Sequence, residues 1–282
     1  MKTIFFGSSH LVLPILDVLK ENSDLKLVVT SDNAGTNYRL LTGSVDSYSR
    51  LNKIPYTISL FADNKIKDLI RKIKPDLGIV ANFGTILDQE LIELFPHGIL
   101  NVHPSLLPKY RGPSPVPSAI LNGEAETGVT LIKIDNQIDH GPIIDQAKHR
   151  LRNSDTSGKV LDLLFLEGAK LLKNNLDGYV SGKIEPREQN HTKAVYTKLM
   201  KKDDGFVDID NPPGKDELNR MIRAYFPWPG TWTKHKLTNK ENIIKLLPGE
   251  KIQVEGKNSM SYKDFINGYP KGKFFLQKLS LI

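Results

Sequence analysis

The stretch that decides the fold is Gly98-Ile-Leu-Asn-Val-His-Pro-Ser-Leu-Leu-Pro-Lys-Tyr-Arg-Gly112. The apolar pair Ile99 and Leu100 predicts the end of a buried strand, and a proline-bounded loop follows at once. Asn101 and His103 stand where that strand ends. Because ligands of an open α/β sheet bind beyond the carboxyl ends of its strands, these two side chains are candidates for chemistry.

A third candidate, Asp139, lies in the segment 135–142, after a β-rich run at 128–134. It is 36 positions beyond His103, which is room for a loop, a helix and a second strand that bring it to the same face. An amide can donate to a developing oxyanion, an imidazole can move a proton near neutral pH, and a carboxylate can orient the imidazole. Each residue alone is more readily explained as a buried polar group of the core. Together they predict acyl transfer.

The start of the chain predicts a βαβ unit. Residues 3–6 and 25–30 form apolar strand-like runs, and residues 11–21 between them have helical periodicity. The turn between the first strand and the helix lacks Gly-x-Gly-x-x-Gly, which argues against a dinucleotide. A further apolar run at 76–81 extends the pattern. We therefore expect an α/β fold with a Rossmann-like, doubly wound, mostly parallel sheet.

Composition excludes several kinds of chemistry. The 282 residues contain no cysteine, so disulfides, thiolate catalysis and cysteine zinc sites are excluded. The seven histidines show no His-x-x-x-His pairing, so we expect no metal. The first strand begins close to Met1 without a leader, and no apolar run reaches membrane-spanning length, which predicts a cytoplasmic protein that does not interact with membranes.

The positive charge is confined to the last third of the chain. Residues 1–186 carry 21 Lys and Arg against 21 Asp and Glu, whereas residues 187–282 carry 18 against 11. A basic surface of this kind suggests a polyanionic partner, and a merely solvated lysine-rich face is the alternative.

The motifs around the candidate residues resemble a known family. Asn101-Val-His-Pro-Ser-Leu-Leu-Pro108 with Tyr110-Arg-Gly112, then residues 123–128 and Ile138-Asp-His-Gly141, are similar to the formyltransferases that use 10-formyltetrahydrofolate. The resemblance implies that Asn101, His103 and Asp139 are catalytic, that 10-formyltetrahydrofolate is the co-substrate, and that no metal takes part.

The resemblance also suggests the acceptor. It is strongest to the members that act on initiator methionyl-tRNA, which implies a tRNA partner and a monomeric enzyme of translation initiation. A sugar-nucleotide amine or glycinamide ribonucleotide is the alternative acceptor. A non-catalytic folate- or RNA-binding module is the alternative of another class.

Two sets of binding residues follow from the resemblance. Those expected to contact the folate are Phe83, Gly84, Ile86, Leu87, Ser105, Leu106, Leu107 and Pro108. For the apolar members of this set, core packing is the alternative. Those expected to contact tRNA are Arg39, Lys109, Arg111, Arg220 and Arg223. The segment 41–46 departs from the family pattern, because Asp46 stands where a base is usual.

The resemblance predicts the domain organisation as well. We expect a formyltransferase domain over 1–184, a linker over 185–203, and a shortened, OB-like β-barrel domain over 204–282. In that last part only 241–247 and 251–255 look like strands, whereas a partly open barrel needs about five. Trp228, in Pro227-Trp-Pro-Gly230, is expected to anchor this domain.

Overall fold

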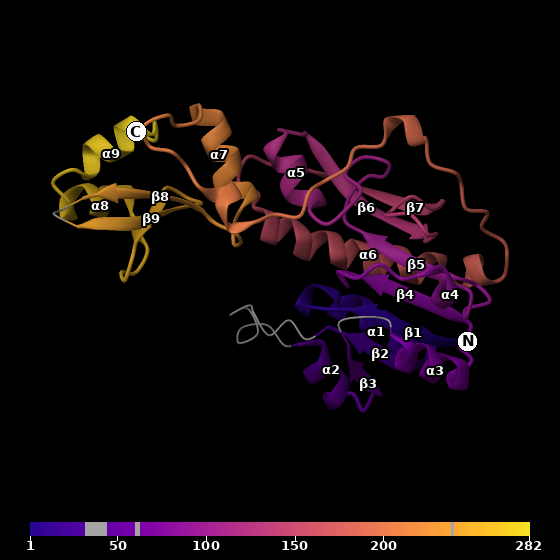
Figure 1. Cartoon of the computed structure of the whole chain (residues 1–282). Coiled ribbons are helices and arrows are strands. Elements are labelled where there is room, and N and C mark those ends of the chain that lie inside the picture. The colour runs from indigo at the N-terminus through magenta and orange to yellow at the C-terminus, as the bar shows by residue number, and fades with distance from the viewer. Residues whose placement is uncertain (32–43, 60–62, 238–239) are drawn as a thin grey trace. The chain divides into compact units, whose positions relative to one another are not determined.

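The computed structural model describes residues 1–31, 44–59, 63–237 and 240–282 (Figure 1). Its contacts group into two compact units. Unit 1 consists of residues 1–113, 127–149 and 161–197. Unit 2 consists of residues 114–126, 150–160 and 198–282. The predicted domain boundaries at 184 and 203 stay a prediction, and each unit is described here by itself.

Unit 1 is built on a seven-stranded sheet with the order β3-β2-β1-β4-β5-β6-β7. Strands β1 to β5 pair in parallel, and β6 runs antiparallel to β5. This arrangement confirms the predicted doubly wound, mostly parallel α/β sheet. The strands are β1 (Lys2–Gly7), β2 (Asp24–Thr30), β3 (Tyr56–Ile58), β4 (Leu77–Ala81), β5 (Ile99–His103), β6 (Glu126–Lys133) and β7 (Ile143–Arg150).

The central strands of the sheet are buried on both faces, as their near-continuous apolar sequences require. Ile4, Phe5 and Phe6 of β1 have no exposed surface. Ile66 and Ile70 pack with Ile4 and Phe6 in one core cluster. The helical elements are η1 (His10–Val12), α1 (Leu13–Asn22), α2 (Val45–Leu51), α3 (Asn64–Ile73), α4 (Gln89–Ile92) and α6 (Ser157–Val180), with η3 (His191–Lys193) in the later chain. The predicted helix at 11–21 is confirmed, with its first turn a 3₁₀ helix.

Strand β5 carries polar residues on one face and apolar residues on the other. Asn101 and His103 are two positions apart and therefore share a face. Val102 lies on the opposite face, where a Cβ built on Gly168 of α6 would stand 2.3 Å from its Cγ1 atom. The absence of a side chain at 168 lets α6 approach the sheet closely. This packing fixes the strand while its other face presents the amide and the imidazole.

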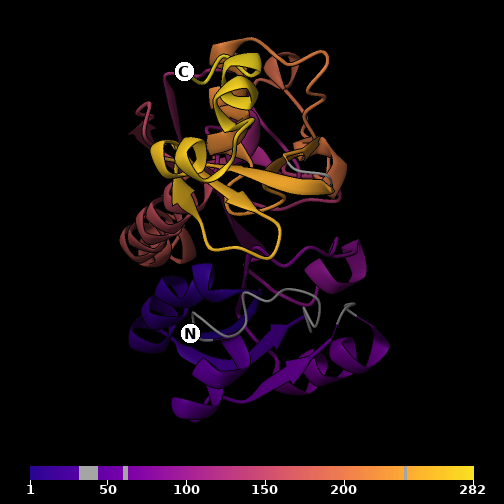
Figure 2. The same cartoon turned by 90° about the vertical axis from the view of Figure 1, so that its left-hand side faces the viewer.

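Unit 2 contains a four-stranded antiparallel sheet with the order β11-β10-β9-β8. Figure 2 shows helices α8 and α9 lying on these strands. Its core cluster joins Ile244 and Leu246 with Phe265 and Phe275. The strands are β8 (Thr231–Lys236), β9 (Glu241–Leu247), β10 (Lys251–Val254) and β11 (Met260–Ser261). The helices of the unit are α5 (Pro115–Leu121), η4 (Lys202–Gly205), α7 (Lys215–Ala224), α8 (Tyr262–Gly268) and α9 (Gly272–Lys278).

Two expectations for unit 2 need correction. The sequence indicated strands only at 241–247 and 251–255, whereas β8 and β11 complete the sheet. Strand β8 was missed because its buried positions are threonines, Thr231 and Thr233, rather than aliphatic residues. Trp228 is 51% exposed, so it does not act as the buried anchor expected of it.

No helix in the described ranges is both long and apolar enough to span a bilayer.

The structure predicts a pH dependence of stability that is specific to unit 2. Burial lowers the pKa of the His235 imidazole from 6.5, and the nearby Lys278 and Lys271 lower it further, while Asp210 acts in the opposite sense. The unfolded chain then binds a proton that the folded chain resists, so stability is present above about pH 6.5 and is lost as the pH falls. We expect urea midpoints to drop between pH 7.5 and pH 5, and the His235→Gln variant to show a flatter profile. A variant with the same slope as the parent would contradict the assignment.

Candidate active site

The end of β5 and the β6–β7 connection meet at one site. In the antiparallel pairing, Asn101 stands opposite Ile132 and His103 opposite Thr130. The chain then leaves β6 and returns as β7, and Asp139 lies in the connection between these strands. The structure therefore brings together the three side chains that the sequence singled out.

The carboxylate of Asp139 is the centre of this cluster. The amide Nδ2 of Asn101 donates to Asp139 Oδ1 at 3.0 Å. The backbone N–H of Gly112 donates to Asp139 Oδ2 at 2.7 Å. His103 Nδ1 lies 3.5 Å from the same Oδ2 atom, and both side chains are largely buried, at 6% and 13% exposed. A buried carboxylate is tolerated only when it is paired and hydrogen-bonded, as this one is.

The imidazole of His103 is held between two acceptors. Its Nε2 atom lies 3.0 Å from the carbonyl oxygen of Tyr110, and its Nδ1 atom faces the Asp139 carboxylate. A carbonyl and a carboxylate can only accept, so the surroundings suit a ring that carries a proton on each nitrogen. Of the two ring protons, the one on Nδ1 faces Asn101 and Asp139.

The backbone around Asp139 is held in an unusual conformation. Asp139 has φ +48°, a left-handed conformation that aspartate adopts more readily than most residues. Gln189 donates from Nε2 to the carbonyls of Asp139, at 2.9 Å, and Gly141, at 2.7 Å. A Cβ at Gly141 would lie 1.9 Å from the carbonyl oxygen of Lys133, so only glycine fits there. The amide of Gln189 thus fixes the loop that carries the carboxylate.

Arg111 supports this loop instead of facing a nucleic acid. Its guanidinium donates from Nε, at 3.2 Å, and NH2, at 2.7 Å, to Oε1 of Gln189, and NH1 donates to the Tyr196 hydroxyl at 3.1 Å. NH2 also lies 2.9 Å from His191 Nδ1. Arg111 is only 1% exposed. The predicted tRNA contact at Arg111 is therefore corrected, because its donors are used inside unit 1.

The segment that supplies Gln189 is paired with the loops of the site. Ile143 and Arg187 exchange two backbone hydrogen bonds of 2.8 Å. Arg111 donates its N–H to Val195 and accepts from the N–H of Thr197, again at 2.8 Å. Sequence reasoning missed Gln189, because a single glutamine in a polar stretch without periodicity carries no signal of burial. The neighbouring histidines are stacked as well, since the rings of His140 and His191 are parallel with centroids 4.0 Å apart.

The residues predicted to contact folate divide into two groups. Several have buried side chains: Phe83 is 4% exposed, Leu87 5%, Leu107 4% and Ser105 0%. Phe83 and Leu87 belong to the core cluster with Phe6, which is the core-packing alternative. Ile86 is 71% exposed, Gly84 is exposed, and Leu106 and Pro108 are half-buried. Because β4 and β5 are parallel neighbours, this second group lies at the same edge of the sheet as Asn101 and His103.

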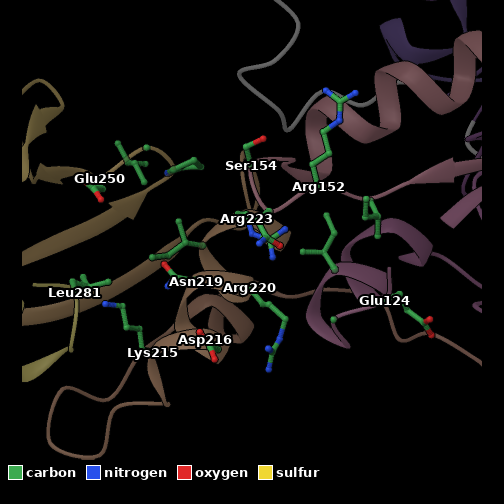
Figure 3. Close-up of a pocket in the computed structure, with 18 of the residues that line it drawn as sticks. Glu124, Arg152, Ser154, Lys215, Asp216, Asn219, Arg220, Arg223, Glu250 and Leu281 are labelled. Atoms are coloured by element: carbon green, nitrogen blue, oxygen red, sulfur yellow. The ribbon is translucent and has the colours of Figure 1, made fainter. Parts of the chain in front are cut away.

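The residues predicted to contact tRNA are divided between the two units. Arg39 lies outside the described residues, and Lys109 is exposed in the loop that follows β5. Arg220 and Arg223 lie on α7 in unit 2, where they line a pocket (Figure 3). In the described part of the chain, no cluster of three or more His, Asp or Glu side chains has the arrangement of a metal site.

The chain is similar in sequence to known formyltransferases. The family model described as formyl transferase matches residues 1–174. A methionyl-tRNA formyltransferase of Chloroflexus aurantiacus is 39% identical over 237 residues, which cover 83% of this chain and 76% of that protein. Another, of Koribacter versatilis, is 33% identical over 301 residues, which cover 95% of this chain and 96% of that protein.

A solved structure shares the fold. It is an N-formyltransferase of Helicobacter canadensis in complex with folinic acid and dTDP-3-aminofucose, with a TM-score of 0.64 and 24% identity. The match covers 90% of this chain and 94% of that chain. At this identity the similarity shows the fold alone.

The hydrogen bonds of Gln189 predict a measurable cost when they are removed. In Gln189→Leu the two loop carbonyls and the Arg111 guanidinium lose a buried partner, and an unpaired buried group costs about 1–3 kcal/mol. We expect the free energy of unfolding, measured in urea, to fall by at least that amount. The matched control is Glu185→Gln at an exposed position of the same segment, which should leave stability unchanged. Equal stability of the two variants would show that the network contributes nothing.

Proposed function

The chain belongs to the formyl transferase family, and from this membership we propose that it transfers a formyl group from 10-formyltetrahydrofolate to the α-amine of initiator methionyl-tRNA. The observation that carries the proposal is the meeting of Asn101, His103 and Asp139 at the end of β5. The names of the curated relatives favour methionyl-tRNA over a sugar-nucleotide amine or glycinamide ribonucleotide. The product would serve translation initiation.

The loop after β4 suits a flat heterocycle such as a pterin. Gly84 has φ +76°, and a Cβ there would have no atom within 4 Å, so the backbone is open to a ligand. Ile86 exposes 71% of its surface nearby in the chain. Exposed backbone donors and acceptors beside an apolar side chain are typical of sites for such rings. We assign the folate contact to the backbone of 83–87 and to Ile86, Leu106 and Pro108, with the buried side chains shaping the loop.

Asn101 is the proposed donor to the oxyanion. One N–H of its amide is used by Asp139, and the second has no partner among the described residues. Attack of the amine on the formyl carbon places negative charge on the formyl oxygen, and a donor held in advance stabilises that charge. The Asp139 bond sets the rotamer of the amide. It also identifies which atom is nitrogen, because a carboxylate can only accept.

His103 and Asp139 are the proposed proton-handling pair. With Nε2 anchored on the Tyr110 carbonyl, the imidazolium directs its Nδ1 proton toward the site, where it can support the oxyanion and assist protonation of the folate N10 as the N10–formyl bond breaks. Asp139 stabilises the imidazolium and helps to take the proton that the amine loses, directly or through water. Proton gain at N10 and proton loss at the amine then balance.

Substitutions in the cluster test these roles. We expect Asn101→Ala and Asp139→Asn to lower kcat by about 100-fold or more, the usual cost of losing one oxyanion donor or its support. Folate affinity, measured by fluorescence titration, should stay close to that of the parent, because neither side chain belongs to the loop after β4. Near-parental kcat in either variant would refute the assignment.

A control variant separates chemistry from charge. Asp135→Asn neutralises a carboxylate in the same β6–β7 connection, whose partner is His140 Nδ1 at 2.7 Å and not His103. It should retain most of the activity. A loss equal to that of Asp139→Asn would mean that both substitutions act by disturbing the loop.

The acceptor is tested by a direct comparison of substrates. Purified protein is supplied with 10-formyltetrahydrofolate and, in parallel, with initiator methionyl-tRNA, a dTDP-amino sugar or glycinamide ribonucleotide. We expect turnover with the tRNA only. Turnover with either small amine and none with tRNA would reassign the acceptor and keep the reaction. No turnover with any amine would support a non-catalytic folate-binding module.

A further inference from the structure

The loop after β4 is fixed at its start and open in its middle. Asn82 Nδ2 donates to the carbonyl oxygen of Ser8 at 3.0 Å and to Ser9 Oγ at 2.9 Å. Further along the loop, a Cβ on Gly84 would have no atom within 4 Å, and Ile86 is 71% exposed. These two positions contribute little packing, so the shape of the loop depends on how its ends are held.

Lys67 of α3 holds the other end of this loop. Its Nζ atom donates to Asp88 Oδ2 at 2.7 Å and to Glu90 Oε2 at 2.5 Å. The Lys67 side chain is 7% exposed, whereas those of Asp88 and Glu90 are 56% and 58% exposed. Asp88 directly follows Leu87, the last residue assigned to the folate contact. A buried ammonium group thus holds a carboxylate at the point where the loop ends.

Asp88 uses one oxygen atom within its own helix and the other for Lys67. Oδ1 accepts from the backbone N–H of Leu91 at 2.9 Å, which is the N-cap bond of α4. Oδ2 accepts from the ammonium group of Lys67. The N-cap bond is local to α4, so the bond to Lys67 is the one that ties the end of the loop to a different helix.

Helix α3 is a firm support for this contact because its apolar side belongs to the core. Ile66 and Ile70 are 4% and 0% exposed. They share a core cluster with Phe83 and Leu87, the two buried apolar side chains of the loop. Lys67 therefore adds an ionic contact at the end of a loop whose buried side chains share a core with the same helix.

The ion pairs favour the charged forms of all three groups. Hydrogen bonds from Lys67 lower the pKa of the Asp88 and Glu90 carboxyls, and the same bonds raise the pKa of the Lys67 ammonium group. Arg71, one turn further along α3, donates to Glu90 Oε1 at 2.6 Å. Without Lys67, Glu90 would keep a cation, whereas Asp88 would have none among the residues that the structure describes.

We propose that Lys67 is a positioning residue for folate binding, which keeps the loop after β4 in its binding conformation by holding Asp88. This inference rests on the proposed function, because it takes the folate to bind at this loop. A ligand that meets a preformed loop does not have to order it, so loss of the tether lowers the affinity. The chemical step depends on Asn101, His103 and Asp139, so kcat should not depend on Lys67.

A long-range effect of charge makes a different prediction. The folate is an anion, so a cation at position 67 attracts it and a carboxylate at position 88 repels it. Charge alone would therefore weaken binding in Lys67→Met and strengthen it in Asp88→Asn. Asparagine is as good an N-cap as aspartate, but its NH2 group cannot accept from Lys67. The tether thus predicts weaker binding in both variants.

Calorimetric titration of the full chain with folinic acid, a stable 5-formyl analogue of the co-substrate, tests the proposal. In Lys67→Met and in Asp88→Asn we expect Kd to rise about three- to tenfold, because binding must then order the loop. KM for 10-formyltetrahydrofolate should rise in parallel while kcat stays unchanged. Lys67→Arg keeps the cation and should restore most of the affinity. Lys67→Met should fold, because both carboxylates are more than half exposed and regain water.

A double-mutant cycle shows whether Lys67 and Asp88 act through one contact. If they do, the variant that combines Lys67→Met with Asp88→Asn has the Kd of Lys67→Met alone. The matched control Lys72→Gln removes an exposed cation from the same helix and should keep the parental Kd. Additive effects in the combined variant, opposite shifts in the two single variants, or equal effects of Lys72→Gln and Lys67→Met would each overturn the proposal.

Direct binding also separates this inference from the proposed function. If the parent and Lys67→Met bind folinic acid equally well, only the positioning role fails. If the variants bind it more weakly and the parent formylates no amine, the reaction fails and the positioning role stands. If the parent binds no folinic acid and formylates no amine, both fail, and the contacts of Lys67 serve only to join α3 to α4.

Discussion

The structure of the site depends on one carboxylate that must be satisfied away from water. Asp139 accepts from the amide of Asn101 and the N–H of Gly112, and it faces the imidazole of His103. These partners come from the end of β5 and from the loop beyond it, whereas Asp139 comes from the β6–β7 connection. Because burying an unpaired charge is costly, the carboxylate ties three separate stretches of chain into one geometry. The same bonds that stabilise the charge also orient the groups that react.

A second layer of polar contacts keeps the carboxylate in place. Asp139 has a left-handed backbone, which persists only where the surroundings over-determine it. Gln189 supplies that constraint through two carbonyls, and Arg111 holds Gln189 through both Nε and NH2. The strained loop is therefore supported by a segment more than 45 residues further along the chain, since Gln189 lies 48 positions beyond Gly141. The segment around Gln189 is therefore more than a connection between the two units, because it buries Gln189 against Arg111.

The sequence predicted those features of the fold that leave a local pattern of apolar residues, glycines or prolines. The strand that ends at His103 was predicted because it contains apolar residues and prolines follow it. The parallel sheet was predicted from the alternation of strands and helices. The sequence did not predict which loop residues are buried. Arg111 looks like a surface cation in sequence and is 1% exposed, and Phe83 looks like a pocket wall and packs on Phe6 with ring centroids 5.8 Å apart. Strand β8 was missed for a related reason, because a buried threonine leaves no hydrophobic pattern.

Because burial and ion pairing cannot be seen in the sequence, the net charge also has to be interpreted again from the structure. Counting residues places the whole excess of +7 after residue 186, which suggests a broad basic surface. The structure divides those cations by environment: Lys278 pairs with Asp210 at 2.6 Å, whereas Arg220 and Arg223 donate to the backbone carbonyls of Leu121 and Asp155. A charge that is already paired adds little to the attraction of an anion, and an oriented, partly desolvated one adds much more. The total count of basic residues therefore overstates the positive charge that remains unpaired on the folded chain.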